Sequence, residues 1–238
     1  MLLPTKAIVL HKTNYSESSI VVQVFTLEYG KVGLLVQGVK KRKSRTKAAL
    51  FEPLSLIEIV GNFTDTEKLV RPREVKLHTP FISIQTEMSK RMLAIFISEM
   101  LYKCIKLPHP DLEMFNYVEN ALVYLENSRE NNANFHISFL LELSKHLGFH
   151  PQKSDGVYFD MLEGNFTNSI PQSNSYLQGE EKDLFLHALG INIDKSATMN
   201  FTSSQRKSVL ASVIKYYQTH ISGLGEIKSH VVLESIFS

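Results

Sequence analysis

The fold of the N-terminal part is decided by residues 19–39, SIVVQVFTLEYGKVGLLVQGV. Two runs rich in Val and Leu lie on either side of a short turn, Glu28-Tyr29-Gly30. Gly30 can adopt the left-handed backbone conformation that a tight hairpin turn needs. The pattern therefore predicts that the two runs pair as neighbouring β-strands.

Working outward from this hairpin, similar apolar runs separated by turn residues fill the first 80 residues. Five strands in a segment of this length predict a small β-barrel. Pro72 in the fifth run has no N–H to donate to a strand ladder, so we expect an edge or a bulge there. Alternation in that run puts Leu69, Arg71, Arg73, Val75 and Leu77 on one face. The five runs are 6–12, 19–26, 31–39, 54–60 and 68–78.

The hydrophobic spacing changes to that of helices after residue 81. Apolar residues recur every three or four positions between Met88 and Cys104, which predicts a largely buried helix. Asp111 is placed to cap the next helix, and Thr202 to Gln205 form a capping-box pattern. Other helices are expected at 135–147, 180–189 and 229–236, an inward helix face at Phe115, Val118, Leu122 and Leu125, and a hairpin excursion at about 152–178.

These patterns predict an α+β, multidomain chain. Residues 1–80 would form the five-stranded barrel, and residues 81–238 an all-helical domain that carries the hairpin excursion. The composition, 43% hydrophobic and 21% charged, is that of an ordinary globular protein. We find no run of about 18 or more apolar residues and no signal peptide, and therefore expect a cytoplasmic protein without a membrane partner. The single cysteine, Cys104, excludes an intramolecular disulfide and a Cys-rich zinc site.

Charge is unevenly divided along the chain. Residues 1–80 carry 13 Lys or Arg against 7 Asp or Glu, a net charge of +6, whereas residues 81–238 carry 13 against 17, a net charge of −4. Such asymmetry points to a polyanionic partner for the first part of the chain.

The strongest local signal is the basic run within residues 38–47, GVKKRKSRTK. A solvated surface loop is the simplest interpretation of any charge run, but this one lies in the positively charged half and follows a strand. We therefore predict that it neutralises phosphates and releases counterions. The predicted DNA-binding residues are Lys40, Lys41, Arg42, Lys43, Arg45 and Lys47, with Lys12, Lys31, Arg71 and Arg73 extending the patch.

Four aromatic residues of the same half could stack on bases, although core packing is the simpler interpretation of each one taken singly. They are Tyr15, Tyr29, Phe51 and Phe63.

No catalytic motif accompanies these features. The sequence holds no GxSxG elbow, no Walker phosphate loop and no GxGxxG. His146 and His150 are four residues apart, but Gly148 interrupts the helix between them, so a shared metal site is not expected. Two alternatives remain open at this point: a protein of similar fold that binds structured RNA, and an enzyme that uses one of the histidines.

Residues 15–59 resemble the N-terminal domain of the RecO family. The resemblance is carried by Glu17-Ser18 before the second strand, by a Gly followed by basic residues at Gly38 and 40–43, and by the Phe-Thr, acid and Gly positions of the hairpin. The Ala-Leu then Pro of Ala49, Leu50 and Pro53, KHLGFHP at 145–151 and IKSHVVLESIF at 227–237 extend it along the chain.

The resemblance implies an OB-fold domain that binds single- and double-stranded DNA, followed by a helical domain that contacts partners. It implies a mediator without catalytic activity, which anneals complementary strands and, with RecR, helps RecA replace single-strand-binding protein. The acidic C-terminal tail of that protein would dock on the helical domain, where helix 135–147 offers His136, Lys145 and His146 as basic groups.

One departure from the family concerns zinc. Many members hold zinc with four cysteines in the excursion, and residues 152–178 here contain none. We therefore expect no metal and no cofactor, and packing of the excursion by Tyr158, Phe159, Phe166 and Tyr176 instead.

Overall fold

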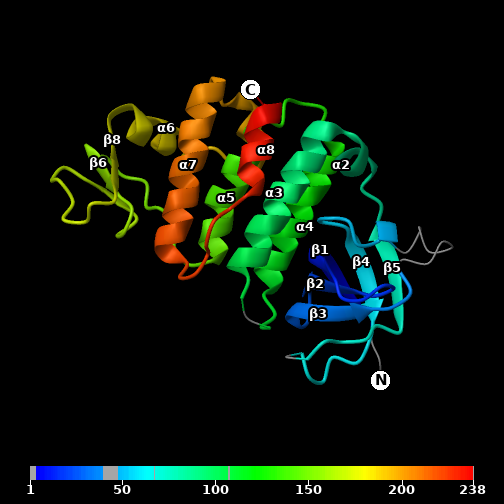
Figure 1. The fold of residues 1–238 in the computed structure, drawn as a ribbon. Helices are drawn as coiled ribbons and strands as arrows, with labels where there is room; N and C mark the ends of the chain where they lie inside the picture. Colours follow the sequence, from blue (N-terminus) through cyan, green and yellow to red (C-terminus); the bar gives the residue numbers. More distant parts are fainter. Residues whose placement is uncertain (1–3, 40–47, 67, 107, 238) are drawn as a thin grey trace. The chain divides into compact units, whose positions relative to one another are not determined.

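The computed structural model describes residues 4–39, 48–66, 68–106 and 108–237. The chain divides into two compact units, residues 1–127 and 128–238. Figure 1 shows the strands of the first unit in blue and cyan, and the helices and small sheet of the second unit in green to red.

A five-stranded antiparallel sheet begins the first unit, in the order β3-β2-β1-β4-β5. Its β2–β3 hairpin turns at Gly30, whose φ is 65°, as the sequence predicts. The fifth strand starts at Glu74, six residues later than predicted. The strands are β1 (Pro4–Asn14), β2 (Ile20–Thr26), β3 (Gly30–Val36), β4 (Leu56–Val60) and β5 (Glu74–Thr79).

The sheet is not a closed barrel among the described residues, and Pro72 explains where the seam opens. β3 meets the chain ahead of β5 at one parallel bridge, Leu34 to Val70. There the Leu35 N–H donates to the Val70 carbonyl over 2.9 Å, and the Val70 N–H donates to Gly33 over 2.8 Å. The next N–H of a parallel ladder would come from residue 72, which is proline and has none. The strand ladder predicted for residues 68–78 is therefore interrupted at Pro72.

Alternating apolar residues of the strands form the core of this sheet. Val22, Val24, Leu34 and Ile57 are completely buried. At the start of the fifth run the bridge to β3 turns Val70 inward and leaves Leu69 43% exposed.

Three helices complete the first unit: α2 (Ile82–Thr86), α3 (Met88–Cys104) and α4 (Leu112–Asn127). The four residues predicted for the inward face of α4 are all completely buried. The Asp111 carboxylate accepts the Met114 N–H over 2.8 Å, which confirms the predicted cap.

The sheet and α4 are joined by one ion pair and one aromatic contact. The Lys6 ammonium on β1 lies 2.7 Å from a Glu119 carboxylate oxygen on α4, and Phe25 packs on Phe115 with ring centroids 5.6 Å apart. Lys6 also lies over the Phe115 ring, 5.7 Å from its centroid. These contacts place α4 in the same compact unit as the strands.

The short helix α2 has no side-chain cap of its own and takes one from the end of α4. The Glu126 carboxylate accepts the backbone N–H groups of Ile82, Ser83 and Ile84, over 2.8, 2.9 and 3.0 Å. Burial by itself would raise the pKa of Glu126, but these hydrogen bonds to the carboxylate outweigh it and hold the pKa below its ordinary value. Helix α2 is thereby fixed to a residue more than 40 positions away in sequence.

The second unit is built around α5 (Phe135–His146) and α7 (Ser203–His220). Thr202 and Gln205 form the predicted capping box at the start of α7. The remaining elements are β6 (Tyr158–Asp160), β7 (Asn165–Thr167), β8 (Tyr176–Gln178), α6 (Gly179–Leu189), the 3-10 helix η1 (Ile193–Thr198) and α8 (Ser229–Ile236).

The excursion is a three-stranded sheet in the order β7-β6-β8, one strand more than the predicted hairpin. Phe159 is completely buried and its ring centroid lies 4.8 Å from Phe166, 4.7 Å from Phe185 and 5.5 Å from Tyr216. Tyr158 and Tyr176 meet edge to face at 5.5 Å. The four aromatic residues predicted to pack the excursion do so.

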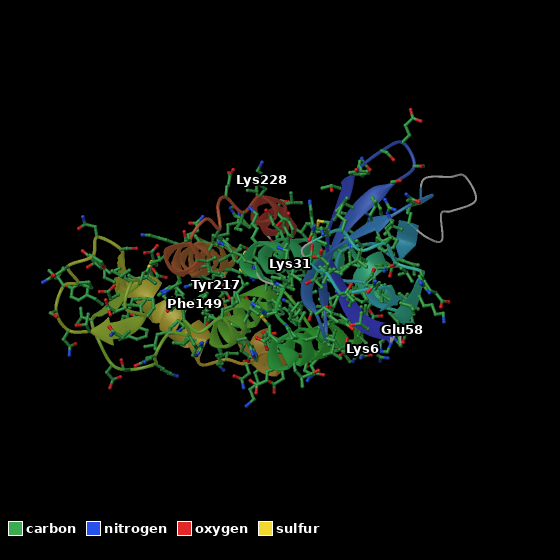
Figure 2. The ribbon with its side chains drawn as sticks, turned by 90° about the horizontal axis from the view of Figure 1, so that it is seen from below. Lys6, Lys31, Glu58, Phe149, Tyr217 and Lys228 are labelled. Atoms are coloured by element: carbon green, nitrogen blue, oxygen red, sulfur yellow. The ribbon has the colours of Figure 1, made fainter. Side chains whose placement is uncertain are left out.

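A second aromatic group joins the end of α5 to α7. The Phe149 ring meets Tyr217 edge to face at 5.0 Å, and Figure 2 labels both residues. The Tyr217 hydroxyl donates to the Leu140 carbonyl over 2.6 Å, so this buried polar group is satisfied within the helical core.

Candidate nucleic-acid interface

A cavity of about 200 Å³ lies at the open seam of the five-stranded sheet. On one side it is lined by Leu35 and Val36 at the end of β3 and by Gln37 just beyond it, and on the other by residues 71–75. Leu50 and Phe51 contribute further apolar wall. The cavity therefore lies where Pro72 interrupts the seam.

Two arginines give this cavity its positive charge. Arg71 and Arg73 both line it and are both exposed, and neither guanidinium pairs with a carboxylate in the part of the chain that the structure describes. The acidic neighbour Glu74 pairs with Lys76 over 3.1 Å. An exposed guanidinium without a carboxylate partner can make bidentate hydrogen bonds to a phosphate.

The predicted basic run, Lys40, Lys41, Arg42, Lys43, Arg45 and Lys47, falls outside the described residues. The residues that flank the run, Val39 and Ala48, both pack on the core of the sheet. Gln37 and Leu50, a few residues further out on each side, line the cavity together with the two arginines. The structure thus brings the segments that flank the basic run to the same cavity as Arg71 and Arg73.

Two of the other predicted DNA-binding residues, Lys12 and Lys31, make contacts within the protein. The Lys12 ammonium pairs with Glu52 over 2.7 Å, although both side chains remain partly exposed. The Lys31 ammonium lies over the Tyr102 ring of α3 and donates to the Tyr102 carbonyl. Burial lowers the pKa of Lys31 to about 8. Lys31 therefore faces α3, and we leave it out of the candidate interface.

The four candidate stacking residues separate into core and surface. Phe51 and Phe63 are buried, and Tyr29 stacks on Phe63 with centroids 4.4 Å apart. Tyr15 is 64% exposed. Core packing accounts for the first three, and Tyr15 is the one whose ring is open to a base.

The predicted partner-binding residues do not form one group. His136 is buried near the start of α5, and burial, reinforced by Arg206, lowers its pKa to about 3, so the imidazole is neutral near pH 7. The prediction that His136 supplies positive charge is therefore wrong. Lys145 and His146 lie nine and ten residues along the same helix, roughly 14 Å away at 1.5 Å per residue.

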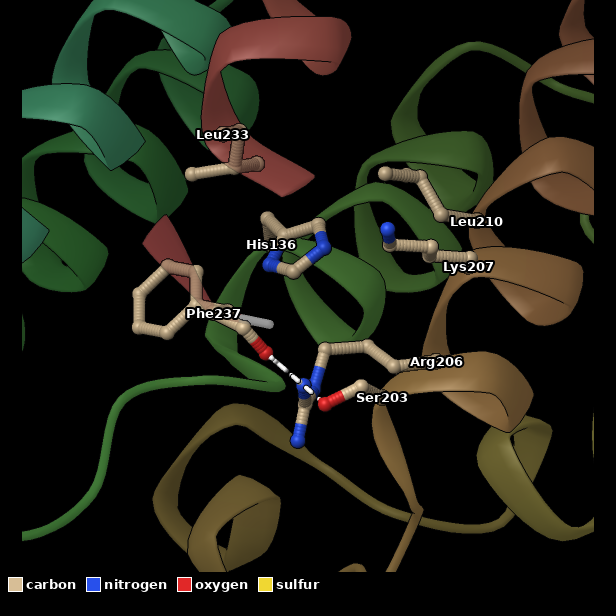
Figure 3. A pocket seen from close by; sticks show the side chains of 7 residues that line it. All are labelled: His136, Ser203, Arg206, Lys207, Leu210, Leu233 and Phe237. Carbon is tan, nitrogen blue, oxygen red and sulfur yellow. Dashed lines mark hydrogen bonds between the residues drawn. The ribbon is translucent and has the colours of Figure 1, made fainter. Parts of the chain in front are cut away.

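His136 instead lines a small pocket of the second unit with two cations that the sequence did not single out, Arg206 and Lys207 (Figure 3). The Arg206 guanidinium donates to the Phe237 carbonyl over 2.7 Å and to the Asn134 side chain over 3.0 Å. Lys207 is exposed. Both cations lie three or four residues before Leu210 and so share its helix face, which is the signal that could have indicated them.

No three His, Cys, Asp or Glu side chains among the described residues gather in a group that could hold a metal ion. No helix in the same part of the chain is long and apolar enough to cross a membrane.

Comparison with known proteins gives matches along the whole chain. Residues 1–81 match the family model described as recombination protein O N terminal, and residues 85–229 match recombination protein O C terminal. Proteins named DNA repair protein RecO are similar over their full lengths and all of this chain: 37% identical in Flavobacterium psychrophilum, 33% in Bacteroides fragilis and 32% in Azobacteroides pseudotrichonymphae. With an OB-fold sheet, a helical C-terminal part and both family models matched in order, the chain belongs to the RecO family of DNA repair proteins.

Proposed function

We propose that this chain is a non-catalytic, DNA-binding mediator of recombinational repair, and that the open end of its five-stranded sheet is the DNA-binding surface. One observation carries the proposal: Gln37 and Leu50, which lie on either side of the basic run in sequence, line one cavity together with Arg71 and Arg73. The basic run and the two arginines carry eight positive charges between them. Family membership supports the role in DNA repair.

The mechanism is electrostatic. Two DNA strands that must anneal repel one another through their phosphates, and a cationic surface that contacts both backbones lowers this repulsion. No bond is made or broken, so no side chain needs a perturbed pKa at this surface. We further propose that the chain acts with RecR to help RecA replace single-strand-binding protein on single-stranded DNA. Its proposed substrate places it in the cytoplasm, at the nucleoid during repair.

For the C-terminal tail of single-strand-binding protein we propose the pocket of Figure 3. Leu210 and Leu233 supply apolar wall, and the exposed Lys207 supplies a cation for an acidic peptide. A Lys207→Glu variant would then lose affinity for a tail peptide and keep its affinity for DNA, whereas unchanged tail binding would exclude this pocket.

The test of the DNA-binding function is fluorescence anisotropy of a labelled single-stranded oligonucleotide as a function of salt. The native protein should show a log–log slope of roughly −2 to −4, for three to six phosphates at about −0.7 each. A variant with Lys40, Lys41, Arg42 and Lys43 changed to Gln should lose most of that slope.

The matched control removes the same charge from exposed lysines of the second unit: Lys153, Lys195, Lys215 and Lys228 changed to Gln. The control should bind DNA like the native chain. If both variants lose the same amount of DNA affinity, net charge alone determines binding. If the native chain does not bind DNA, the proposal is overturned. Equal competition by an RNA of the same sequence would favour a general nucleic-acid binder. The strand-annealing rate of complementary oligonucleotides should fall in the same variant.

A further inference from the structure

We propose that the cavity beside Pro72 holds one unstacked base of a bound DNA strand, with Arg71 and Arg73 on the neighbouring phosphates. This proposal rests on the DNA-binding function above and specifies which part of the strand the cavity takes. Three features of the cavity support it: its free backbone groups, its apolar walls and its unpaired arginines.

The first feature is the Leu35 carbonyl on the edge of β3 and the Gln37 N–H just beyond its end. The Leu35 N–H donates to Val70, and the Leu35 carbonyl faces the same seam because the N–H and C=O of one strand residue point to the same side. Gln37, one residue past the end of β3, also lines the cavity. Residue 72 would be the natural partner of the Leu35 carbonyl, and as proline it has no N–H. Neither group has a backbone partner in the described part of the chain.

A neighbouring acceptor and donor suit the edge of a nucleic-acid base. Each base carries a donor beside an acceptor on its Watson–Crick edge, and proteins read unstacked bases through that edge. Because the arrangement suits any base, it gives binding without strong sequence preference. A water molecule could satisfy each group singly, but it would leave the apolar walls of the cavity without a partner.

The second feature is the apolar lining, which distinguishes a base from a phosphate. Leu35, Leu50, Phe51 and Val75 form walls that an anion would leave empty. The flat faces of a base are apolar and gain by burial against such side chains. The third feature, the two arginines without carboxylate partners, supplies charge for the phosphates on either side of the base.

A peptide strand added to the edge of β3 is the competing occupant. Strand addition uses a row of main-chain hydrogen bonds along an exposed edge. Here the free edge at the cavity extends only from the Leu35 carbonyl to the Gln37 amide, because Leu35 N–H and Gly33 are already bonded to Val70. That edge is too short for a peptide strand and long enough for one base.

The experiment compares a short single-stranded oligonucleotide with its abasic counterpart, which keeps the sugars and phosphates and lacks the bases. Affinities of the native protein for both are measured by competition against a labelled strand. The base-bearing strand should bind about tenfold more tightly, as expected for the stacking of one base. Equal affinities, with the steep salt dependence intact, would overturn the base pocket and leave the DNA-binding function standing.

Two pairs of variants locate the effect in the cavity. Val75→Phe fills the cavity and should abolish the preference for the base-bearing strand, whereas Leu77→Phe, on the same strand but outside the cavity, should keep it. Arg73→Gln should lower the affinity for both oligonucleotides more than Lys76→Gln does. Thermal unfolding of each variant reports whether it folds. If Val75→Phe does not fold, Pro72→Ala, which gives residue 72 an N–H for the Leu35 carbonyl, is the second test and should lower the same preference.

The remaining outcomes separate the two proposals. If the native protein binds neither oligonucleotide, the DNA-binding function fails and the base pocket fails with it. An acidic pentapeptide is also tested as a competitor of the oligonucleotide. If it displaces the oligonucleotide from the native protein, and does so less well from Val75→Phe than from Leu77→Phe, the cavity takes a peptide and the base pocket is overturned.

Discussion

The ammonium group of Lys31 on β3 lies 4.2 Å from the centroid of the Tyr102 ring on α3. Attraction between a cation and an aromatic face, together with the hydrogen bond to the Tyr102 carbonyl, partly compensates the loss of water around this charge. The contact joins the sheet to α3 and uses a lysine that the sequence assigned to DNA.

The first prediction concerns how this contact responds to pH. Burial lowers the pKa of Lys31 from 10.5 to about 8, so between these values the unfolded chain binds more protons than the folded one. The free energy of unfolding contributed by Lys31 should therefore rise with pH through that window, by about 1 kcal/mol once solvent screening of this half-exposed group is allowed for. Urea unfolding of the native chain and of Lys31→Met, compared from about pH 7 to 10, measures the difference. Lys76→Met is the exposed control, and a difference that stays constant with pH would contradict the prediction.

The second prediction compares two glycines with positive φ. Gly30 has φ 65° and an added Cβ would lie 2.3 Å from the His109 carbonyl oxygen, whereas Gly38 has φ 73° and open space around it. Gly38→Ala should lower the free energy of unfolding by about 1 to 2 kcal/mol, because alanine is strained in the left-handed conformation. Gly30→Ala should cost at least about 1 kcal/mol more, because the overlap with His109 adds to the same conformational penalty. Chemical denaturation of both variants gives the comparison, and equal costs would mean that the close approach to His109 is relieved without loss.

The third prediction tests the aromatic packing of the excursion. Phe159→Ala removes the ring at the centre of the cluster and should destabilise the second unit by about 3 to 5 kcal/mol. Leu162→Ala, at a 55% exposed position of the same excursion, should change stability by less than about 0.5 kcal/mol. Near-ultraviolet circular dichroism during unfolding follows the aromatic cluster directly. Similar losses in the two variants would show that the cluster does not hold the excursion together.

The fourth prediction concerns metal. Since residues 152–178 contain no cysteine and aromatic side chains pack the excursion, a strong chelator should leave the unfolding midpoint unchanged. Differential scanning calorimetry with and without the chelator measures this midpoint. A fall in the midpoint, accompanied by zinc in elemental analysis, would contradict it.

The fifth prediction follows from Pro72. Pro72→Ala supplies the missing N–H, which should bond to the Leu35 carbonyl and continue the seam from Val70. Hydrogen exchange at residue 72 should then be slow, and the preference for a base-bearing over an abasic strand should fall. Pro53→Ala, away from this seam, is the control. Fast exchange at residue 72 would show that the seam stays open for a reason other than the missing donor.

Local patterns in the sequence predicted most of the elements. Gly30 in the hairpin, the cap at Asp111 and the capping box at Thr202 are each determined by residues within about four positions of one another. The third strand of the excursion, β8, was not predicted. The equally short β6 and β7 lie on either side of the Glu163-Gly164 turn, whereas β8 pairs with β6 without such a turn between them.

Long-range relationships were not predictable in the same way. The partner of Lys31 lies 71 residues away, and no local pattern indicates that this charge turns toward α3. The cavity needs the end of β3, Leu50 and residues 71–75 to meet, which depends on the long-range bridge between Leu34 and Val70. The neutral state of His136 likewise depends on burial that its helix alone does not reveal. DNA binding by residues 40–47 stays a prediction.

The cap that Glu126 places on α2 and the Lys6–Glu119 ion pair both connect α4 to earlier parts of the chain. They therefore limit where the chain can be divided to make chimaeras. The family models divide the chain after residue 81, yet the compact unit continues to residue 127. A gene fragment ending at residue 81 would encode the strands without α4, whose Phe115 packs on Phe25 and whose Glu119 pairs with Lys6. Exchange of the strand-bearing part between relatives should therefore yield well-folded chimaeras only when α3 and α4 are inherited with it.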